Sequence, residues 1–284
     1  MCKVIDGKET AKQIRAEIRE EVLALKEKYG KVPGLAVVIV GEDPASKVYV
    51  NSKVRACEEL GIYSEKHVMN VETTETELLE LVDSLNKNED IHGILVQLPL
   101  PKGLNSKLII DSIAKEKDVD GFHAENIGKV LIGEEDTFKS CTPYGVVELL
   151  KRYELPISGQ DVVIVGRSNI VGKPLAALLI NESATVQVCH SRTKNLEDKV
   201  KQADIVVAAV GIANFIKGSM IKDGAVVIDV GINRLEDGTL CGDVDYEEAK
   251  EKASYITPVP GGVGPMTIAM LMKNTLISFE RTVK

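Results

Sequence analysis

The stretch Asp161-Val-Val-Ile-Val-Gly-Arg-Ser-Asn-Ile-Val-Gly-Lys-Pro174 decides the fold. An apolar run ends in a turn of small residues, and a helix-forming segment follows over 175–180. Such a strand–turn–helix opens a dinucleotide-binding unit, in which backbone N–H groups at a helix N-terminus receive phosphate. The usual G-x-G-x-x-G spacing is incomplete, because Ser168 and Val171 stand at two glycine positions. The cofactor-binding residues predicted in this turn are Gly166, Arg167, Ser168 and Gly172.

The next predicted strand, 184–189, ends in His190-Ser191-Arg192. In NAD-selective enzymes an acidic residue about 20 residues past the glycines holds the ribose 2′-hydroxyl. This strand end carries Ser191 and Arg192 instead of an acid, and together with Arg167 they suit a 2′-phosphate. The sequence therefore predicts NADP rather than NAD as the cofactor. An ordinary βαβ unit with a solvated strand end is the alternative.

Length and charge limit the classes of function. A chain of 284 residues can bury a substantial core and has room for two domains. Its formal net charge of -8 argues against a nucleic-acid partner, because phosphate neutralisation requires concentrated Lys and Arg. Neither a membrane-length apolar run nor a signal-peptide pattern is found. We therefore expect a cytoplasmic protein with no membrane partner.

The cysteines and histidines suggest neither disulfides nor metal. The 5 cysteines are scattered without C-x-x-C spacing, which favours reduced thiols. None of the 4 histidines stands at metal-ligand spacing from another ligand. We expect no metal site.

The first half of the chain alternates strand and helix patterns, as an α/β domain does. Apolar residues recur at three- and four-residue steps over 7–29, which predicts a long amphipathic helix. The apolar runs 35–40 and 93–99 are typical of buried parallel strands. Further helices are expected over 44–60 and 77–86.

The second half repeats this alternation around the glycine turn. A helix is expected to begin with Thr142 as its N-cap and Pro143 as its first residue. The fold class is thus α/β with two domains, an α/β domain over 1–140 and a Rossmann-like parallel-sheet domain over 141–284. The last helix, from about 265 to 284, could pack back on the first domain. The predicted strands are 161–165, 184–189, 204–209, 225–230 and a short one near 255–257.

Two residues of the helix predicted over 44–60 could carry chemistry. Tyr49 and Lys53 lie four apart and therefore share one face. Tyr-x-x-x-Lys is also the catalytic pair of short-chain dehydrogenases, but there the pair follows the cofactor turn. Here it precedes the turn by more than a hundred residues, which argues against that family. A surface lysine beside a half-buried tyrosine is the alternative.

Three other places combine polar residues with unusual surroundings. Gln97 interrupts an apolar strand near its carboxyl end, where open α/β sheets place ligands. It needs a partner because an unpaired buried amide costs about 1–3 kcal/mol, and a structural glutamine of the core is the alternative. The loop 118–123 contains Asp118 and Asp120, which could be turn residues or could face an amino-pyrimidine ring. The segment 258–267 is rich in Gly and Pro, as in a ligand-binding loop or an interdomain hinge.

Together these segments resemble the bifunctional methylenetetrahydrofolate dehydrogenase/methenyltetrahydrofolate cyclohydrolase family. Each motif alone is weak, but the ordered set is specific and covers nearly the whole chain. One departure is Ser140, where the family usually has Pro. The matching segments are 49–53 with 56–58, 93–101, 118–123, 141–143, 166–172, 189–193, 229–232 and 258–267.

The resemblance implies two successive reactions on folate held in the cleft between two domains, usually in a homodimer. NADP would oxidise 5,10-methylenetetrahydrofolate to the 5,10-methenyl cation, and hydrolysis would then give 10-formyltetrahydrofolate, a one-carbon donor for purine synthesis. Hydride transfer requires only alignment of the nicotinamide. Hydrolysis requires a proton carrier, and a lysine can serve if a pocket beside a cationic substrate lowers its pKa from about 10.4 toward neutrality.

The resemblance also implies residue roles. Lys53 would be the proton carrier and Gln97 would orient it. Tyr49 would lie against the reacting part of folate, and Asp120 would hold the pterin ring. The remaining implied binding residues are Pro260, Gly261 and Gly262 for the substrate and Ile232 for the cofactor.

Two rival classes are weighed against this family. Another NADP oxidoreductase with a similar plan, such as a shikimate dehydrogenase-like protein, would be expected to lack Tyr49, Lys53, Gln97 and Asp120 before the cofactor turn. A folate- or nucleotide-binding sensor would have lost turnover. The presence of Lys53 together with the whole cofactor turn argues against such a sensor.

Overall fold

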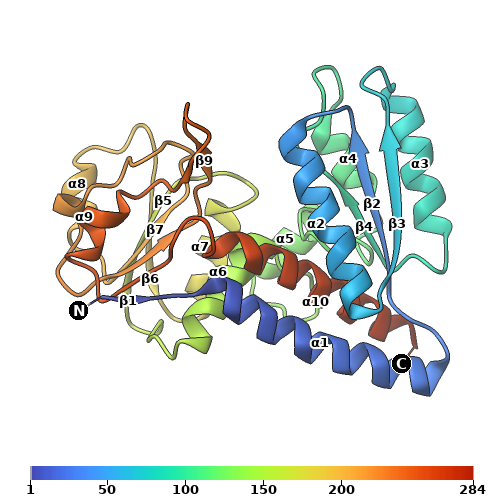
Figure 1. Cartoon of the computed structure of the whole chain (residues 1–284), viewed down its shortest axis with the longest axis horizontal. Coiled ribbons are helices and arrows are strands. Elements are labelled where there is room, and N and C mark those ends of the chain that lie inside the picture. Colours follow the sequence, from blue (N-terminus) through green and yellow to red (C-terminus); the bar gives the residue numbers. More distant parts are fainter. Residues whose placement is uncertain (1, 284) are drawn as a thin grey trace. The chain divides into compact units, whose positions relative to one another are not determined.

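A computed structural model describes residues 2–283, apart from the side chain of Ala45. The chain forms two compact units, each with its own parallel sheet (Figure 1). The six-stranded unit comprises the residues up to Lys12, Val130–Glu135 and Ser140–Thr267. The three-stranded unit comprises Gln13–Lys129, Asp136–Lys139 and the residues from Ile268 onward. Helices α1 (Gly7–Tyr29) and α10 (Val263–Val283) contribute residues to both.

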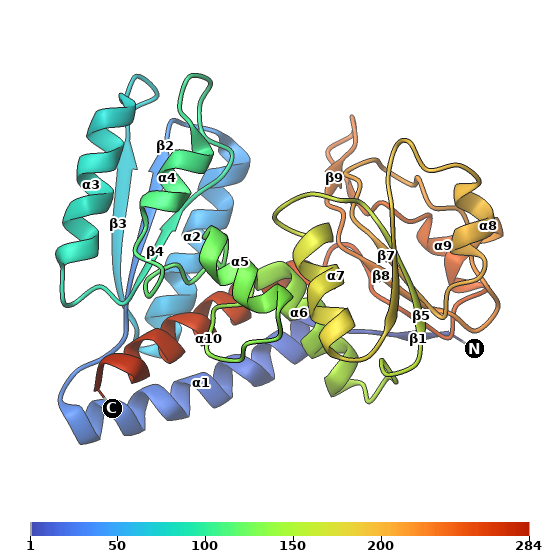
Figure 2. The ribbon, with the colours of Figure 1, turned by 180° about the vertical axis from the view of Figure 1, so that it is seen from behind.

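The three-stranded sheet has the order β3-β2-β4, and both pairs are parallel. Its central strand β2 (Gly34–Val40) is buried along its whole length, as a parallel strand covered on both faces must be. Helices α3 (Glu75–Lys87) and α4 (Ser106–Ser112) cover one face, and α2 (Pro44–Leu60) lies on the other (Figure 2). The two outer strands are β3 (Tyr63–Met69) and β4 (Gly93–Val96).

Local signals set the ends of α2, the helix that carries Tyr49 and Lys53. The Asp43 carboxylate accepts a hydrogen bond from the Ser46 N–H, and Pro44 occupies the first turn, where a missing N–H is tolerated. The helix ends at Gly61, whose φ of +73° is accessible to glycine at little cost. These caps fix where Lys53 lies along the helix.

The six-stranded sheet has the order β1-β11-β8-β7-β5-β6, and all its pairs are parallel. The chain moves outward from β5 to β6 and then crosses to β7 on the other side of β5, which creates a switch point in the strand order. The strands are β1 (Lys3–Val4), β5 (Asp161–Val165), β6 (Thr185–Cys189), β7 (Ile205–Ala208), β8 (Val226–Asp229) and β11 (Tyr255–Ile256).

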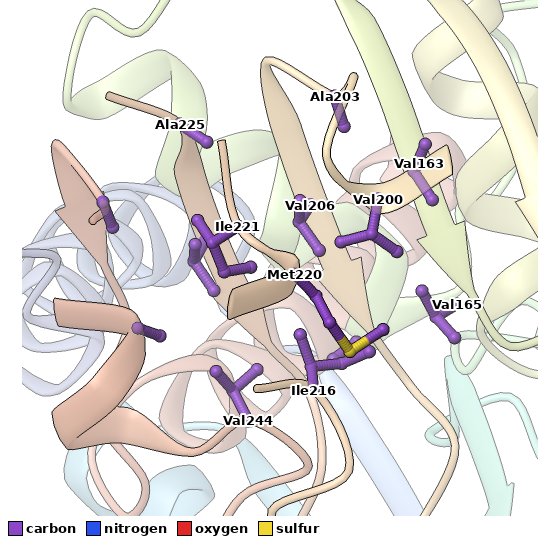
Figure 3. Packing of buried hydrophobic residues seen from close by; sticks show 14 of the residues in the cluster. Val163, Val165, Val200, Ala203, Val206, Ile216, Met220, Ile221, Ala225 and Val244 are labelled. Carbon is purple, nitrogen blue, oxygen red and sulfur yellow. The ribbon is translucent and has the colours of Figure 1, made fainter. Parts of the chain in front are cut away.

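One hydrophobic core covers a face of this sheet. Val163, Val165 and Val206 from the strands pack against Ile216 and Met220 (Figure 3). Further helices and a hairpin complete the unit. The 3-10 helix η1 (Gly218–Met220) lies beside the core, and β9 (Asn233–Arg234) and β10 (Leu240–Cys241) form an antiparallel hairpin after β8. The further helices are α6 (Cys141–Arg152), α7 (Gly172–Asn181), α8 (Leu196–Val200) and α9 (Tyr246–Lys250). Helix α5 (Ala124–Leu131) begins in the three-stranded unit.

The predicted fold class is confirmed, as are the helices over 7–29 and 44–60. The predicted start of α6 is wrong, because the helix begins at Cys141 with Ser140 as its N-cap. Pro143 is tolerated inside the first turn, where N–H groups lack helical partners anyway. The domain boundary at 140 stays a prediction, and the residues up to Lys12 group with the six-stranded unit.

No helix among residues 2–283 combines the length and hydropathy needed to cross a membrane.

The last helix, α10, is held to the three-stranded unit by polar contacts. Asn274 is buried, and its Nδ2 donates to the carbonyl oxygens of Val119 at 2.8 Å and Lys139 at 3.0 Å. Ser278 donates to the carbonyl oxygen of His92 at 2.6 Å.

Replacing Asn274 with Ala should weaken the three-stranded unit. The change leaves two buried carbonyl oxygens without this donor, at a cost of about 2–4 kcal/mol in unfolding free energy. Amide hydrogen exchange in β2 and α3 reports on this unit. Thr282→Ala, which removes only a bond within α10, is the matched control. Equal exchange rates in the two variants would contradict the assigned role of Asn274.

Candidate active site

The central feature of the three-stranded unit is a hydrogen bond between Lys53 and Gln97. Lys53 lies on α2 and is only 7% exposed, and its Nζ donates to Gln97 Oε1 at 2.9 Å. Gln97 immediately follows β4, and its Nε2 donates to the carbonyl oxygen of Leu98 at 2.6 Å. The second bond fixes the amide so that its oxygen faces Lys53. The buried amino group therefore has an oriented acceptor, which lowers the cost of removing it from water.

Tyr49 stands one helical turn before Lys53 on α2. Its side chain is partly exposed, and burial of the remainder raises the pKa of its phenol. Its neighbour Val48 is 66% exposed, so this part of α2 presents apolar surface. An aromatic ring beside a buried lysine can pack against a flat ligand while the lysine reaches its polar atoms.

Asp118 organises the loop that carries Asp120. The Asp118 carboxylate is buried and accepts hydrogen bonds from the backbone N–H groups of Phe122 and His123 at 3.1 and 2.9 Å. It also accepts one from Asn126 Nδ2 at 2.8 Å. Burial raises the pKa of Asp118 to about 6, although these donors oppose the shift. The sequence alone does not distinguish the two carboxylates of this loop. In the structure Asp118 is buried and holds the loop in shape, whereas Asp120 is less buried.

The six-stranded unit has a cavity of about 550 Å³ at the carboxyl ends of β5, β6 and β7. It lies at the switch point in the strand order, which is where open α/β sheets bind their ligands. Three predicted residues of the glycine turn and one predicted serine line it. The lining residues include Gly166, Arg167, Ser168, His190, Ser191, Thr193, Ala209, Val210, Ile212 and Phe215.

Close packing explains the two glycines of the turn. Gly166 has a φ of +138°, and a Cβ there would lie 2.2 Å from the carbonyl oxygen of Ala209. A Cβ at Gly172 would lie 2.2 Å from the carbonyl oxygen of Gly166. Both positions therefore exclude any larger residue, and their spacing sets the tight connection from β5 to α7.

Ser168 alters the expected use of the helix N-terminus. Its Oγ accepts from the N–H groups of Val171 and Gly172 at 3.1 and 3.4 Å, and its carbonyl oxygen accepts from the Lys173 N–H at 3.1 Å. In a dinucleotide-binding unit such N–H groups are expected to receive phosphate. In this structure the hydroxyl oxygen of the serine that replaces a glycine accepts these N–H groups at the start of α7, and its hydroxyl hydrogen is available to donate elsewhere.

Two predicted cofactor residues lie outside the lining of this cavity. Arg192 is exposed, and its backbone N–H donates to His190 Nδ1 at 3.2 Å. Ile232 is 46% exposed, and its δ-carbon lies 3.4 Å from the position of a Cβ on Gly264. Ile232 therefore lies near the start of α10 rather than among the residues around the glycine turn.

The glycine-rich segment after β11 packs against the start of α1. The Lys8 N–H donates to the carbonyl oxygen of Gly261 at 2.9 Å, and Gly261 has a φ of +107°. A Cβ on Gly262 would lie 2.5 Å from the carbonyl oxygen of Pro258. The segment that includes Pro260 belongs to the six-stranded unit, whereas Lys53, Gln97, Tyr49 and Asp120 belong to the three-stranded unit.

Sequence reasoning missed the loop 209–215, which supplies one wall of the cavity. It follows β7 and contributes Val210, Ile212 and Phe215 to the lining. Ile212 is 53% exposed and Phe215 is 38% exposed. Apolar residues directly after a buried parallel strand were the available signal, because ligands bind at that end of the sheet.

Among residues 2–283, none of the five cysteines forms a disulfide, and burial raises the pKa of the Cys57 thiol to about 12. Across residues 2–283, no three or more His, Cys, Asp or Glu side chains gather in a way that could hold a metal ion.

Comparison with known proteins identifies the family. The catalytic domain of tetrahydrofolate dehydrogenase/cyclohydrolase matches residues 5–120, and the NAD(P)-binding domain of tetrahydrofolate dehydrogenase/cyclohydrolase matches residues 140–283. The bifunctional protein FolD of Bacillus licheniformis is 59% identical over 281 residues, which cover 99% of this chain and 98% of that protein.

Solved structures agree with this match. A bifunctional FolD methylenetetrahydrofolate dehydrogenase/cyclohydrolase from Campylobacter jejuni has a TM-score of 0.98 at 51% identity, covering 99% of this chain and 100% of its own. The Trypanosoma brucei FolD, solved with NADP and an inhibitor, has a TM-score of 0.96 at 41% identity, covering 100% of this chain and 99% of its own. The chain therefore belongs to the tetrahydrofolate dehydrogenase/cyclohydrolase family.

Proposed function

We infer that the chain is a bifunctional enzyme of one-carbon metabolism. It oxidises 5,10-methylenetetrahydrofolate to 5,10-methenyltetrahydrofolate with NADP and then hydrolyses the product to 10-formyltetrahydrofolate. Relatives named as bifunctional FolD match over nearly the full chain. The buried hydrogen bond from Lys53 to Gln97 carries the inference from this structure, because the hydrolytic step needs such a lysine.

The dehydrogenase step places few chemical demands on the protein. The two nitrogens that flank the methylene carbon delocalise the positive charge left when hydride departs. NADP supplies the hydride acceptor when it is bound. The side chains therefore need only to hold the reactants close and aligned, which is positioning work.

The cyclohydrolase step requires proton transfer. Water adds to the amidinium carbon of the methenyl cation and loses a proton. N5 then takes up a proton as its bond to that carbon breaks, and the hydroxyl of the adduct loses its remaining proton to become the formyl carbonyl. The balance is the methenyl cation plus water giving 10-formyltetrahydrofolate and one proton. We assign the proton transfers to the Lys53 amine, which Gln97 holds in one orientation.

We propose that three groups bind the folate. Asp120 holds the amino-pyrimidine part of the pterin through its carboxylate, on a loop that Asp118 keeps in shape. Tyr49 packs against the reacting part, one turn from Lys53. The backbone of Pro260, Gly261 and Gly262 contacts the substrate where the glycines allow close approach.

The residues around the cavity of the six-stranded unit fit NADP. Close packing at Gly166 and Gly172 keeps the glycine turn tight, and Arg167 and Ser191 line the same cavity as Gly166. We propose that this arginine and serine receive the 2′-phosphate, with the Ser168 hydroxyl as a further donor. Gly166 and Gly172 shape the turn. Arg192 and Ile232 are proposed as outer contacts of the cofactor.

We further propose that the enzyme is a homodimer that pairs through β3. This strand is at one edge of its sheet. At the other edge, the Ile94 N–H of β4 donates to the carbonyl oxygen of Lys117, so the segment around Lys117 covers part of that strand. Val68 on β3 is 60% exposed and the nearby Val71 is 58% exposed. An exposed apolar sheet edge is a template for pairing with another chain.

The Lys53→Met variant should separate the two activities. Met keeps most of the side-chain volume but cannot carry a proton, so hydrolysis of supplied methenyltetrahydrofolate should fall by about a hundredfold or more. Hydride transfer to NADP should persist in part. Both rates are measured spectrophotometrically. Lys47→Met, on the same helix but in an exposed ion pair with Glu42, is the control and should keep both activities.

Asp120→Ala is the contrasting variant, because substrate binding serves both reactions. It should raise the KM for folate in the dehydrogenase and cyclohydrolase assays alike. Normal hydrolysis by Lys53→Met would refute the assignment of Lys53, and unchanged KM values in Asp120→Ala would leave Asp120 as a turn residue.

The Arg167→Ala variant should reduce the preference for NADP. Loss of a charged donor to the 2′-phosphate should raise the KM for NADP by about tenfold or more while the KM for NAD changes little. Lys173→Ala removes one positive charge from the same turn, outside the cavity lining, and serves as the control. Equal KM values for NADP and NAD in the unaltered enzyme would argue against the 2′-phosphate site.

Sedimentation tests the dimer. The unaltered chain should sediment with the mass of two copies at micromolar concentration, and Val68→Lys should shift it toward one copy. Leu23→Lys places the same charge on α1 at a residue that is 52% exposed, and it should not alter the mass. A single-copy mass for the unaltered chain at all concentrations would disprove the proposal.

A further inference from the structure

A buried carboxylate lies behind one wall of the cavity in the six-stranded unit. Asp243 is 0% exposed. Its Oδ2 accepts from the backbone N–H groups of Val210 at 2.6 Å and Gly211 at 2.9 Å. Its Oδ1 accepts from the Ile212 N–H at 3.0 Å and from Asn233 Nδ2 at 2.9 Å. All four partners are donors, which suits the acceptor-only character of a carboxylate.

These bonds hold a loop that would otherwise be mobile. Val210 and Ile212 line the cavity, yet Gly211 and Ile212 are exposed to solvent. Exposed loops with few buried contacts are the regions that open most readily. Here three successive N–H groups are directed inward onto one charge. Displacing the loop therefore breaks charge-assisted hydrogen bonds, which are stronger than neutral ones.

A second carboxylate fixes the position of the first. Asp229, at the end of β8, accepts through Oδ1 from the Asp243 N–H at 3.0 Å and through Oδ2 from the Val244 N–H at 2.8 Å. Two glycines make room for this arrangement. A Cβ on Gly231 would lie 2.2 Å from Asp243 Oδ1, and one on Gly242 would lie 1.8 Å from Asp229 Oδ2.

We propose that Asp243 is a positioning residue for the NADP site. It holds residues 210–212, which follow β7 and form one wall of the cavity. The glycine turn that follows the neighbouring strand β5 lines the same cavity. The wall is thus formed before the cofactor arrives, so binding does not have to order this loop. The inference rests on the proposed function and adds a residue that touches neither the folate nor the reacting atoms.

The Asp243→Asn variant tests this role at nearly constant shape. An amide offers one acceptor oxygen and one NH₂ group, so its nitrogen must face a backbone N–H that the carboxylate had accepted. The KM for NADP in the dehydrogenase assay should rise by about tenfold, which corresponds to about 1.4 kcal/mol. Hydrolysis of supplied methenyltetrahydrofolate should keep its rate, because that step consumes no NADP and Lys53 lies in the three-stranded unit.

Asp245→Asn is the matched control. This carboxylate stands two residues away and pairs with Lys217 at 3.0 Å on the surface. The same chemical change there should leave both activities and both KM values unaltered. Amide hydrogen exchange gives a second readout, in which Val210, Gly211 and Ile212 should exchange faster in Asp243→Asn than in Asp245→Asn without cofactor.

The outcomes separate this inference from the proposed function. If the unaltered enzyme fails to reduce NADP, the proposed function is wrong. If it reduces NADP and Asp243→Asn keeps its KM within about twofold, the positioning role is wrong. Equal losses in both reactions would also overturn it, because they would mark Asp243 as a purely structural residue. Should Asp243→Asn not fold, Asn233→Ala removes one of the four donors, and an unchanged KM for NADP there would count against the role.

Discussion

A buried polar group must find its partner inside the protein, and this constraint shapes both units. Lys53 is nearly excluded from solvent, and its Nζ donates to an amide whose own orientation is fixed by the carbonyl oxygen of the next residue. Asp243 is fully buried, and its carboxylate accepts from four N–H donors. An isolated buried charge would cost far more than either fold could tolerate. The charged groups are therefore held in single orientations before any ligand binds.

The two units apply this constraint to different chemistry. In the three-stranded unit a helix and a strand end bring a lysine and a glutamine together, and we propose that this pair supplies a positioned proton carrier for the cyclohydrolase reaction. In the six-stranded unit, buried carboxylates and close-packed glycines shape the loops after β5, β7 and β8, and we propose that these loops form a preformed site for NADP. Preorganisation of this kind lowers the entropic cost of ordering the loops when the cofactor binds. It also aligns the reactants of the dehydrogenase reaction, which needs little acid or base catalysis.

The sequence predicted the features whose physical signal is local. The run 35–40 is continuously apolar because β2 is central and covered on both faces. The residues that cap α2 stand directly before and after that helix in the sequence. The need of Gln97 for a partner could be anticipated because a buried amide needs one, whereas its pairing with Lys53 came from the family resemblance. Strand β3 was missed because Glu65, Lys66 and His67 interrupt the apolar pattern of an edge strand. Asp243 was missed because its partner Val210 lies 33 residues earlier, and its neighbourhood resembles an acidic turn.

The most direct test of this account is a crystal structure of the enzyme with NADP and a folate analogue that mimics the methenyl cation. The account predicts that Lys53 Nζ lies within about 3.5 Å of the one-carbon centre or of the water that attacks it, while keeping its hydrogen bond to Gln97. It also predicts the 2′-phosphate beside Arg167 and Ser191. A folate bound out of reach of Lys53, with another side chain at the reacting carbon, would contradict it.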